Sequence, residues 1–143
     1  MKIPKKSCIL NSEVRSEDSR GSIISISDQV INNVSIIECL PKTIRSNHYH
    51  LTDWHLIYIL EGQIDYFYKN LNEEKINYFF AKKGDNIFTP SNEIHATYFE
   101  IHTTLVVCSK NPRDQINYEK DTLRYNLIDD KNINDLLKKF KSI

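Results

Sequence analysis

The chain has 143 residues, of which 40% are hydrophobic and 27% are charged, so it is long enough for one domain with its own core. Nineteen basic and nineteen acidic residues give a formal net charge of zero, which offers no overall attraction for nucleic acid or for an anionic membrane. No segment approaches the roughly 20 apolar residues of a membrane-spanning helix, and the basic start "MKIPKKSCIL" lacks the apolar core of a signal peptide. We therefore expect a cytoplasmic protein.

Short β-branched or alternating runs follow one another through most of the chain. The polar segment 12–21 is expected to be a surface loop that leads into the first strand. Further segments with strand character are 21–27, 34–40, 55–62, 63–70 and the runs "KINYFFAKK", "NIFTP", "HATYFE" and "TTLVVCSK". Many short strands with closely spaced turn signals predict an all-β sandwich or barrel.

One amphipathic helix is expected near the end of the chain, at about residues 131–141. The apolar residues of "DDKNINDLLKKFKSI" follow the i, i+3, i+4, i+7 pattern of a single buried stripe, at Ile133, Leu136, Leu137 and Phe140. Acidic and amide side chains before this stripe suit a helix start, and the lysines after it suit a helix end. We favour a helix that packs on its own barrel over a helix that binds a partner.

Three of the five histidines fall within residues 45–55, "RSNHYHLTDWH". Side chains two positions apart on a strand share one face, so His48 and His50 are expected to lie side by side. His55 begins the next run after a short turn, and His95 heads a later run that a closed barrel can bring over the same pocket. Four converging imidazoles would suit a divalent transition metal such as Zn, Fe, Ni or Mn.

The spacing of these histidines resembles the two sequence motifs of the cupins. The first motif reads glycine, five residues, H-x-H, three or four residues, glutamate, six residues, glycine, and its places are taken here by His48, His50, His55 and Gly62. The second motif reads glycine, five residues, P-x-G, two residues, histidine, three residues, asparagine, and its places are taken by Gly84, Pro90, Asn92, His95 and Phe99. The resemblance implies a cupin jelly-roll β-barrel in a single domain over 1–143, with the core barrel at about 20–128.

The chain departs from these motifs at several positions. Lys42 and Asn92 stand where the motifs have glycine, and asparagine is the residue that best replaces glycine in a left-handed conformation. Phe99 replaces the final asparagine. His55 stands where cupins usually place a glutamate ligand, with Asp53 as a rival carboxylate. Four neutral histidines would leave a divalent ion its full charge and would favour anionic or enolate-like ligands.

Flanking segments resemble the sugar-processing branch of the cupins. This branch holds nucleotide-sugar 3,4-ketoisomerases, the 3,5-epimerases of dTDP-4-dehydrorhamnose and similar 4-keto sugars, and capsule-biosynthesis cupin domains. The similar segments are 18–21, 45–50 and 118–124, with Ser46 in place of a glycine. The resemblance implies a sugar- or nucleotide-sugar-modifying isomerase or epimerase in cell-surface polysaccharide biosynthesis, a nucleotide sugar as small-molecule ligand, and a homodimer.

Two roles are open for the histidines. In a metal-free site, the resemblance makes His48 and His50 the catalytic acid–base pair. In a metal site, the ligands are His48, His50, His55 and His95. The two roles conflict, because a metal-bound imidazole has no lone pair left to act as a base. We favour the metal, because an acid–base pair alone gives no reason for histidines at positions 55 and 95.

Other residues are candidates for substrate binding. Arg45 can pair with a diphosphate or carboxylate through two parallel hydrogen bonds. Tyr58, Tyr66 and Tyr98 can stack on a base or a sugar, although tyrosines in strands more often serve packing. Two other functions remain open, a non-haem metal-dependent dioxygenase and a non-catalytic cupin that binds a small ligand.

Overall fold

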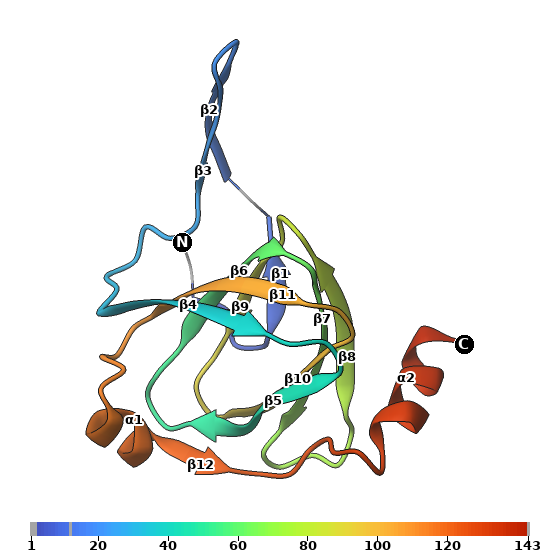
Figure 1. Cartoon of the computed structure of the whole chain (residues 1–143). Coiled ribbons are helices and arrows are strands. Elements are labelled where there is room, and N and C mark those ends of the chain that lie inside the picture. Colours follow the sequence, from blue (N-terminus) through green and yellow to red (C-terminus); the bar gives the residue numbers. More distant parts are fainter. Residues whose placement is uncertain (1–2, 12, 143) are drawn as a thin grey trace.

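The computed structural model describes residues 3–11 and 13–142. Two five-stranded antiparallel sheets face each other and form the predicted all-β jelly-roll barrel (Figure 1). The first sheet runs in the order β1 (Cys8–Leu10), β9 (Asn86–Thr89), β6 (His55–Glu61), β11 (Thr103–Ser109) and β4 (Asn33–Cys39). The second sheet runs in the order β12 (Thr122–Arg124), β5 (Thr43–His50), β10 (Glu93–Phe99), β7 (Gln63–Asn70) and β8 (Asn77–Lys82).

Apolar side chains fill the space between the two sheets. Successive side chains of a strand point to opposite faces, so every second residue enters the barrel. The buried interior cluster includes Ile57, Ile59, Ile64, Phe99 and Leu105. Along β6, His55 shares the inner face with Ile57 and Ile59, and along β10, His95 shares it with Phe99. The strands that build the core therefore also carry the histidines inside.

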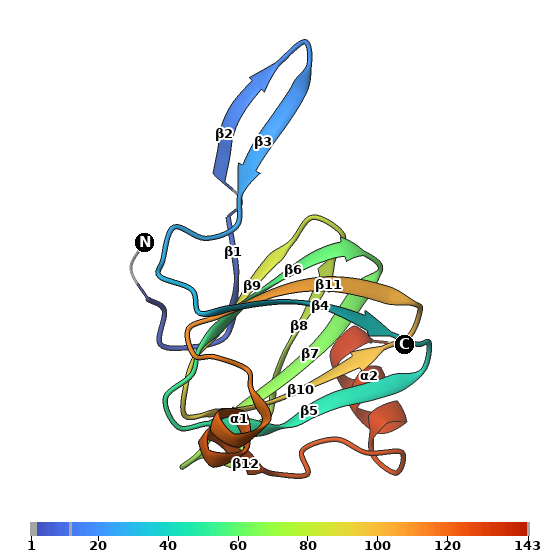
Figure 2. The same cartoon turned by 60° about the vertical axis from the view of Figure 1, so that its left-hand side comes forward.

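A two-stranded hairpin projects from the barrel (Figures 1 and 2). Its strands are β2 (Glu13–Asp18) and β3 (Gly21–Ser25), which among the described residues pair only with each other. The loop expected at 12–21 is thus mostly strand, because Asp18 accepts a hydrogen bond from the Arg20 backbone N–H at 2.8 Å and closes the turn. The barrel also begins before residue 20, because β1 pairs with β9.

In the described part of the chain, two helices lie after β11, one on each side of β12 in the sequence. The predicted helix is α2 (Ile133–Lys141), and it packs on its own barrel through a stack of Phe140 on Tyr78 with ring centroids 5.1 Å apart. A second helix, α1 (Gln115–Asp121), was not expected. It has no buried residue, so no apolar stripe marks it, and it begins at Asp114, whose side chain accepts from the Asn117 backbone N–H. No helix in the described part of the chain is long and apolar enough to cross a membrane.

The two motif positions that lack glycine keep the backbone conformation that glycine favours. Lys42 has a φ of 60° and Asn92 has a φ of 60°. The Asn92 backbone N–H donates to the His50 carbonyl at 2.7 Å, which ties this turn to the end of β5. The left-handed conformation expected for Asn92 is therefore confirmed.

Candidate functional site

A bulge in β5 sets the direction of its two histidines. In the pairing with β10, His95 lies opposite His48 and Ala96 lies opposite Ser46, so Asn47 is an extra residue. Ser46 and Asn47 both have positive φ, at 72° and 56°. The Asn47 side chain turns away from the barrel and accepts from the backbone N–H groups of Leu127 and Ile128, both at 3.0 Å. The bulge thereby anchors the C-terminal segment directly beside the site.

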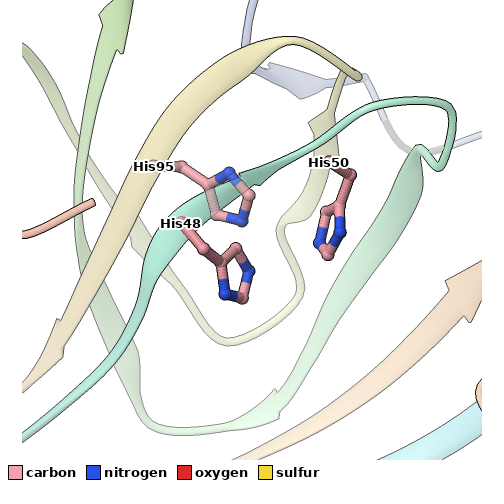
Figure 3. Close-up of side chains that lie close together, drawn as sticks. All are labelled: His48, His50 and His95. Carbon is pink, nitrogen blue, oxygen red and sulfur yellow. The ribbon is translucent and has the colours of Figure 1, made fainter. Parts of the chain in front are cut away.

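The four histidines converge inside the barrel, as their spacing predicted. The ring centroid of His48 lies 4.6 Å from that of His50 and 4.8 Å from that of His95. The ring of His55 lies 5.4 Å from that of His50 and 5.7 Å from that of His95. Each of the four residues is at most 6% exposed. Figure 3 shows the rings of His48, His50 and His95 gathered in the space between the strands.

The ring nitrogens of these histidines have few partners. His95 Nδ1 lies 3.2 Å from the Glu93 carbonyl oxygen, and it carries the proton because a carbonyl only accepts. His48 Nδ1, His55 Nδ1 and His95 Nε2 are buried without a hydrogen-bond partner in the described chain. Buried polar atoms are rarely left unpaired in folded proteins. The unpaired nitrogens therefore indicate a site that is completed by something the chain binds.

Burial keeps the imidazoles of His48, His50 and His95 neutral. Loss of solvent, reinforced by the neighbouring histidines, lowers the pKa of His48 to about 3. The same two causes, in the same order, lower the pKa of His50 to about 4 and the pKa of His95 well below its usual value. At neutral pH each of these three rings therefore has a lone pair, which either a proton or a metal ion can take.

The possible metal-binding groups divide into two overlapping sets. One set is His48, His50 and His95, and the other is His50, Asp53 and His55, with candidate ligand atoms within 4.8 Å of one another in each set. Neutral, buried and unpaired imidazole nitrogens suit Zn, Fe or Ni. The carboxylate that rivals His55 in the sequence is thus also buried beside the cluster, with Asp53 Oδ2 3.9 Å from His55 Nδ1.

A pocket opens over the histidines. It is lined by His48, His50 and His55, and by apolar side chains of the inner faces. Arg45, a predicted binding residue, lies on its wall, and so do Arg113 and Tyr118. The Arg113 guanidinium carbon stands 4.7 Å from the Tyr118 ring centroid, and that ring lies 5.7 Å from the His50 ring. The tail resemblance at 118–124 pointed to Tyr118, whereas nothing in the sequence pointed to Arg113.

The three tyrosines expected at the site do not line the pocket. Tyr58 and Tyr98 each follow a site histidine by three residues, so strand alternation turns them to the outer face. There the Tyr98 hydroxyl donates to Glu100 at 2.5 Å. Tyr66 points inward but lies behind His95, with the two rings parallel and 6.2 Å apart. Its hydroxyl lies 2.7 Å from Thr89 Oγ1, away from the pocket.

Comparisons with known proteins identify solved structures that have the same fold as this chain. No family model and no curated protein matches the sequence. A 3,4-ketoisomerase from Helicobacter canadensis superimposes with a TM-score of 0.68 and 17% identity over 82% of this chain and 90% of that one. A double mutant of a 3,4-ketoisomerase from Thermoanaerobacterium thermosaccharolyticum, in complex with TDP, gives 0.66 and 21% over 96% and 99%. The capsular polysaccharide assembling protein CapF from Staphylococcus aureus gives 0.61 and 18% over 82% of this chain and 32% of CapF. These likenesses confirm the cupin jelly roll.

Proposed function

We propose that this chain is an isomerase that moves the ketone of a nucleotide-linked keto sugar to the neighbouring carbon, in cell-surface polysaccharide biosynthesis. The observation that carries the proposal is the pair of neutral imidazoles of His48 and His50, whose ring centroids lie 4.6 Å apart in the pocket. Its fold is that of several sugar 3,4-ketoisomerases, one of which was solved with TDP. Arg45 and Arg113 at the same pocket can pair with a diphosphate.

The reaction needs two proton transfers. One imidazole removes the proton from the carbon beside the ketone, and the ketone oxygen takes up a proton, which gives an enediol. A proton then returns to the former carbonyl carbon while the other hydroxyl loses its own, so the ketone has moved by one carbon and no atom is gained or lost. A low pKa makes His48 and His50 weak bases in the free protein. Negative charge on the diphosphate and the enediolate would raise both pKa values in the complex.

Turnover of a keto sugar tests this proposal. Purified protein is incubated with a TDP-linked 4-keto-6-deoxyhexose, and proton NMR follows formation of the 3-keto isomer. His48→Gln and His50→Gln should each lower kcat about 100- to 10,000-fold, the usual contribution of a general acid or base. His102→Gln, at an exposed histidine outside the pocket, is the matched control and should leave kcat unchanged. Binding of TDP without any turnover would instead support the non-catalytic alternative.

A second proposal is that the histidine cluster binds a divalent transition metal, Zn, Fe, Ni or Mn. It is supported by the three buried nitrogens without partners and by the two overlapping groups of possible ligands. When bound, such an ion supplies positive charge that can hold an enediolate oxygen, and bound iron would favour the dioxygenase alternative. His48, His50, His55 and His95 would supply the ligands.

Metal content separates the two proposals. In protein purified without a histidine tag, a metal site predicts stoichiometric metal that is reduced in His55→Ala and retained in His55→Glu, which restores a ligand at this position. An acid–base site predicts that exhaustive chelation leaves turnover intact. Full activity without metal would overturn the metal proposal, and activity that returns only with added metal would overturn a free acid–base pair.

We also propose that the chain forms a homodimer. The edge strand β4 exposes Val34 (62%) and Ile36 (71%) on its outer face, and the projecting hairpin exposes Val14 (51%) and Ile23 (64%). Apolar side chains grouped on an open sheet edge are typical of an interface. In sedimentation, the particle should be twice the chain mass of 16.8 kDa, and Ile36→Lys should shift it toward the monomer. A 16.8 kDa particle at micromolar concentration would count against the dimer.

A further inference from the structure

The short strand β12 brings a hydroxyl to one of the two candidate catalytic histidines. Thr122 lies directly opposite His50 in the pairing of β12 with β5. Its Oγ1 is 3.2 Å from His50 Nδ1, and both side chains are buried. This contact joins the barrel strand that carries the site to the segment that follows α1.

The direction of this hydrogen bond is fixed by a second contact of Thr122. The Thr122 hydroxyl donates to the Tyr118 carbonyl oxygen at 2.6 Å, and that oxygen can only accept. A hydroxyl has a single proton, so toward His50 the Thr122 oxygen acts as the acceptor. His50 Nδ1 must then carry the proton of the neutral ring. The lone pair is left on Nε2, the other ring nitrogen of a residue that lines the pocket.

His48 and His95 provide a comparison within the same cluster. The carbonyl oxygen of Glu93 gives His95 the same Nδ1–H tautomer. His48 Nδ1 has no hydrogen-bond partner among the described residues, so no contact of this kind sets the His48 tautomer. Of the two rings of the proposed acid–base pair, only His50 therefore has its protonated nitrogen determined by a neighbouring group of the described chain.

We propose that Thr122 is a positioning residue that holds His50 in the Nδ1–H tautomer and presents its Nε2 lone pair to the substrate. The inference rests on the proposed isomerase function for its catalytic consequence, but the tautomer itself does not depend on any substrate. An imidazole that turns its N–H toward the carbon acid cannot remove a proton from it. The hydroxyl of Thr122 thus determines whether His50 can serve as a base.

Nitrogen NMR of the free protein tests the tautomer directly. In ¹⁵N-histidine-labelled protein, His50 should show a pyrrole-like Nδ1 and a pyridine-like Nε2. Thr122→Val keeps the shape of the side chain but removes the hydroxyl, so the His50 signals should move toward the Nε2–H tautomer that free histidine prefers. Thr122→Ser keeps the hydroxyl and should keep the wild-type signals. The His95 signals are the internal control and should stay pyrrole-like at Nδ1 in all three proteins.

Activity measurements then connect the tautomer to catalysis. Thr122→Val should lower kcat about 10- to 100-fold, with a smaller change in KM, and Thr122→Ser should restore it. A pyridine-like Nδ1 at His50 in the wild-type protein would overturn the inference even if Thr122→Val fails to fold. Unchanged His50 signals in folded Thr122→Val would also overturn it. The expected tautomers without any turnover of keto sugars would leave the inference standing and would refute the proposed function.

Discussion

At the residue scale, two neighbouring positions of β5 have left-handed backbone conformations for different reasons. Asn47 uses its side chain to accept from Leu127 and Ile128 and to donate to the Ile128 carbonyl at 2.8 Å. Ser46 occupies the place of a glycine in the related motif and has a φ of 72°. A left-handed conformation costs a residue other than glycine about 1–3 kcal/mol. This cost is offset by three hydrogen bonds at Asn47.

Glycine substitutions should separate these two positions. Ser46→Gly should raise the free energy of unfolding by about 1 kcal/mol, because relief of backbone strain exceeds the added entropy of the unfolded chain. Asn47→Gly should lower it by about 2 kcal/mol, because three hydrogen bonds to the C-terminal segment are lost. Urea unfolding of both variants provides the measurement. A change of the same sign in both would contradict the account of the bulge.

The buried histidines should make stability depend on pH. The pKa of His48 and His50 falls from 6.5 in a free chain to about 3 and about 4 in the fold. Below pH 6.5 the unfolded chain therefore binds protons that the folded protein does not, so the free energy of unfolding decreases as pH falls toward 4. Each of these two histidines lowers the free energy of unfolding by about 1.4 kcal/mol per pH unit over this range. Urea unfolding between pH 7.5 and 4.5 should show that the free energy of unfolding falls with pH. In His48→Gln this dependence on pH should be weaker. An equally steep dependence in that variant would contradict the role assigned to His48.

At the element scale, the last helix is held to the barrel by a buried charge. Lys141 Nζ lies 2.9 Å from Asp65 Oδ1, and Asp65 is 1% exposed. The Tyr78 hydroxyl donates to the same oxygen at 2.5 Å, and its ring stacks on Phe140. The Asp65 carboxylate therefore depends on α2 for its balancing charge, and the helix depends on the carboxylate for its position.

Removing the lysine should release the helix. Lys141→Met should lower the free energy of unfolding by about 1–3 kcal/mol, because the buried Asp65 carboxylate loses its cation. The range lies below that of a fully buried ion pair because Lys141 is partly exposed. Lys138→Met, at an exposed lysine of the same helix, is the matched control and should change stability little. Urea unfolding measures both. If Asp65→Asn in the Lys141→Met background restores no stability, the role assigned to this ion pair is wrong.

The elements differ in how far the sequence could predict them. Helix α2 was predictable because its apolar residues repeat with the helical period, and the barrel was predictable because its histidines and turns keep the motif spacing. Strand alternation, counted from His55 and His95, would also have turned Tyr58 and Tyr98 outward. Helix α1 has no apolar stripe. Arg113 reaches the pocket and Thr122 reaches His50 only because the chain folds back beside β5, and no local sequence pattern predicts that return.

At the scale of the whole molecule, the barrel strands and the segment that follows β11 both contribute residues to the site. The barrel supplies neutral imidazoles and Arg45, and the returning segment supplies Arg113, Tyr118 and the hydroxyl of Thr122. Two guanidinium groups beside neutral rings make the pocket suited to an anion, although the chain as a whole has a net charge of zero. The proposed affinity for a nucleotide diphosphate would therefore be a local property of this pocket.

Neutralising one guanidinium should weaken binding more than turnover. Arg113→Met should raise the Kd for TDP and the KM for a TDP-linked keto sugar about 10- to 100-fold, because a charge-assisted hydrogen bond contributes about 1.5–3 kcal/mol, with little change in kcat. Titration calorimetry gives the Kd. Lys83→Met, at an exposed lysine paired with Glu61, is the control and should bind TDP normally. Normal TDP binding by Arg113→Met would remove this residue from the binding site.

The measurement that tests the central claim most directly is the isotope content of the sugar after incubation in D₂O with chelator-treated protein. If His48 and His50 move the ketone by acid–base catalysis, a TDP-linked 4-keto-6-deoxyhexose should become the 3-keto isomer with solvent deuterium at carbon 4, and His48→Gln with His50→Gln should abolish the conversion. Recovery of the starting sugar with all its carbon-bound protons, by folded protein that binds TDP, would contradict the assignment of this site as a ketoisomerase.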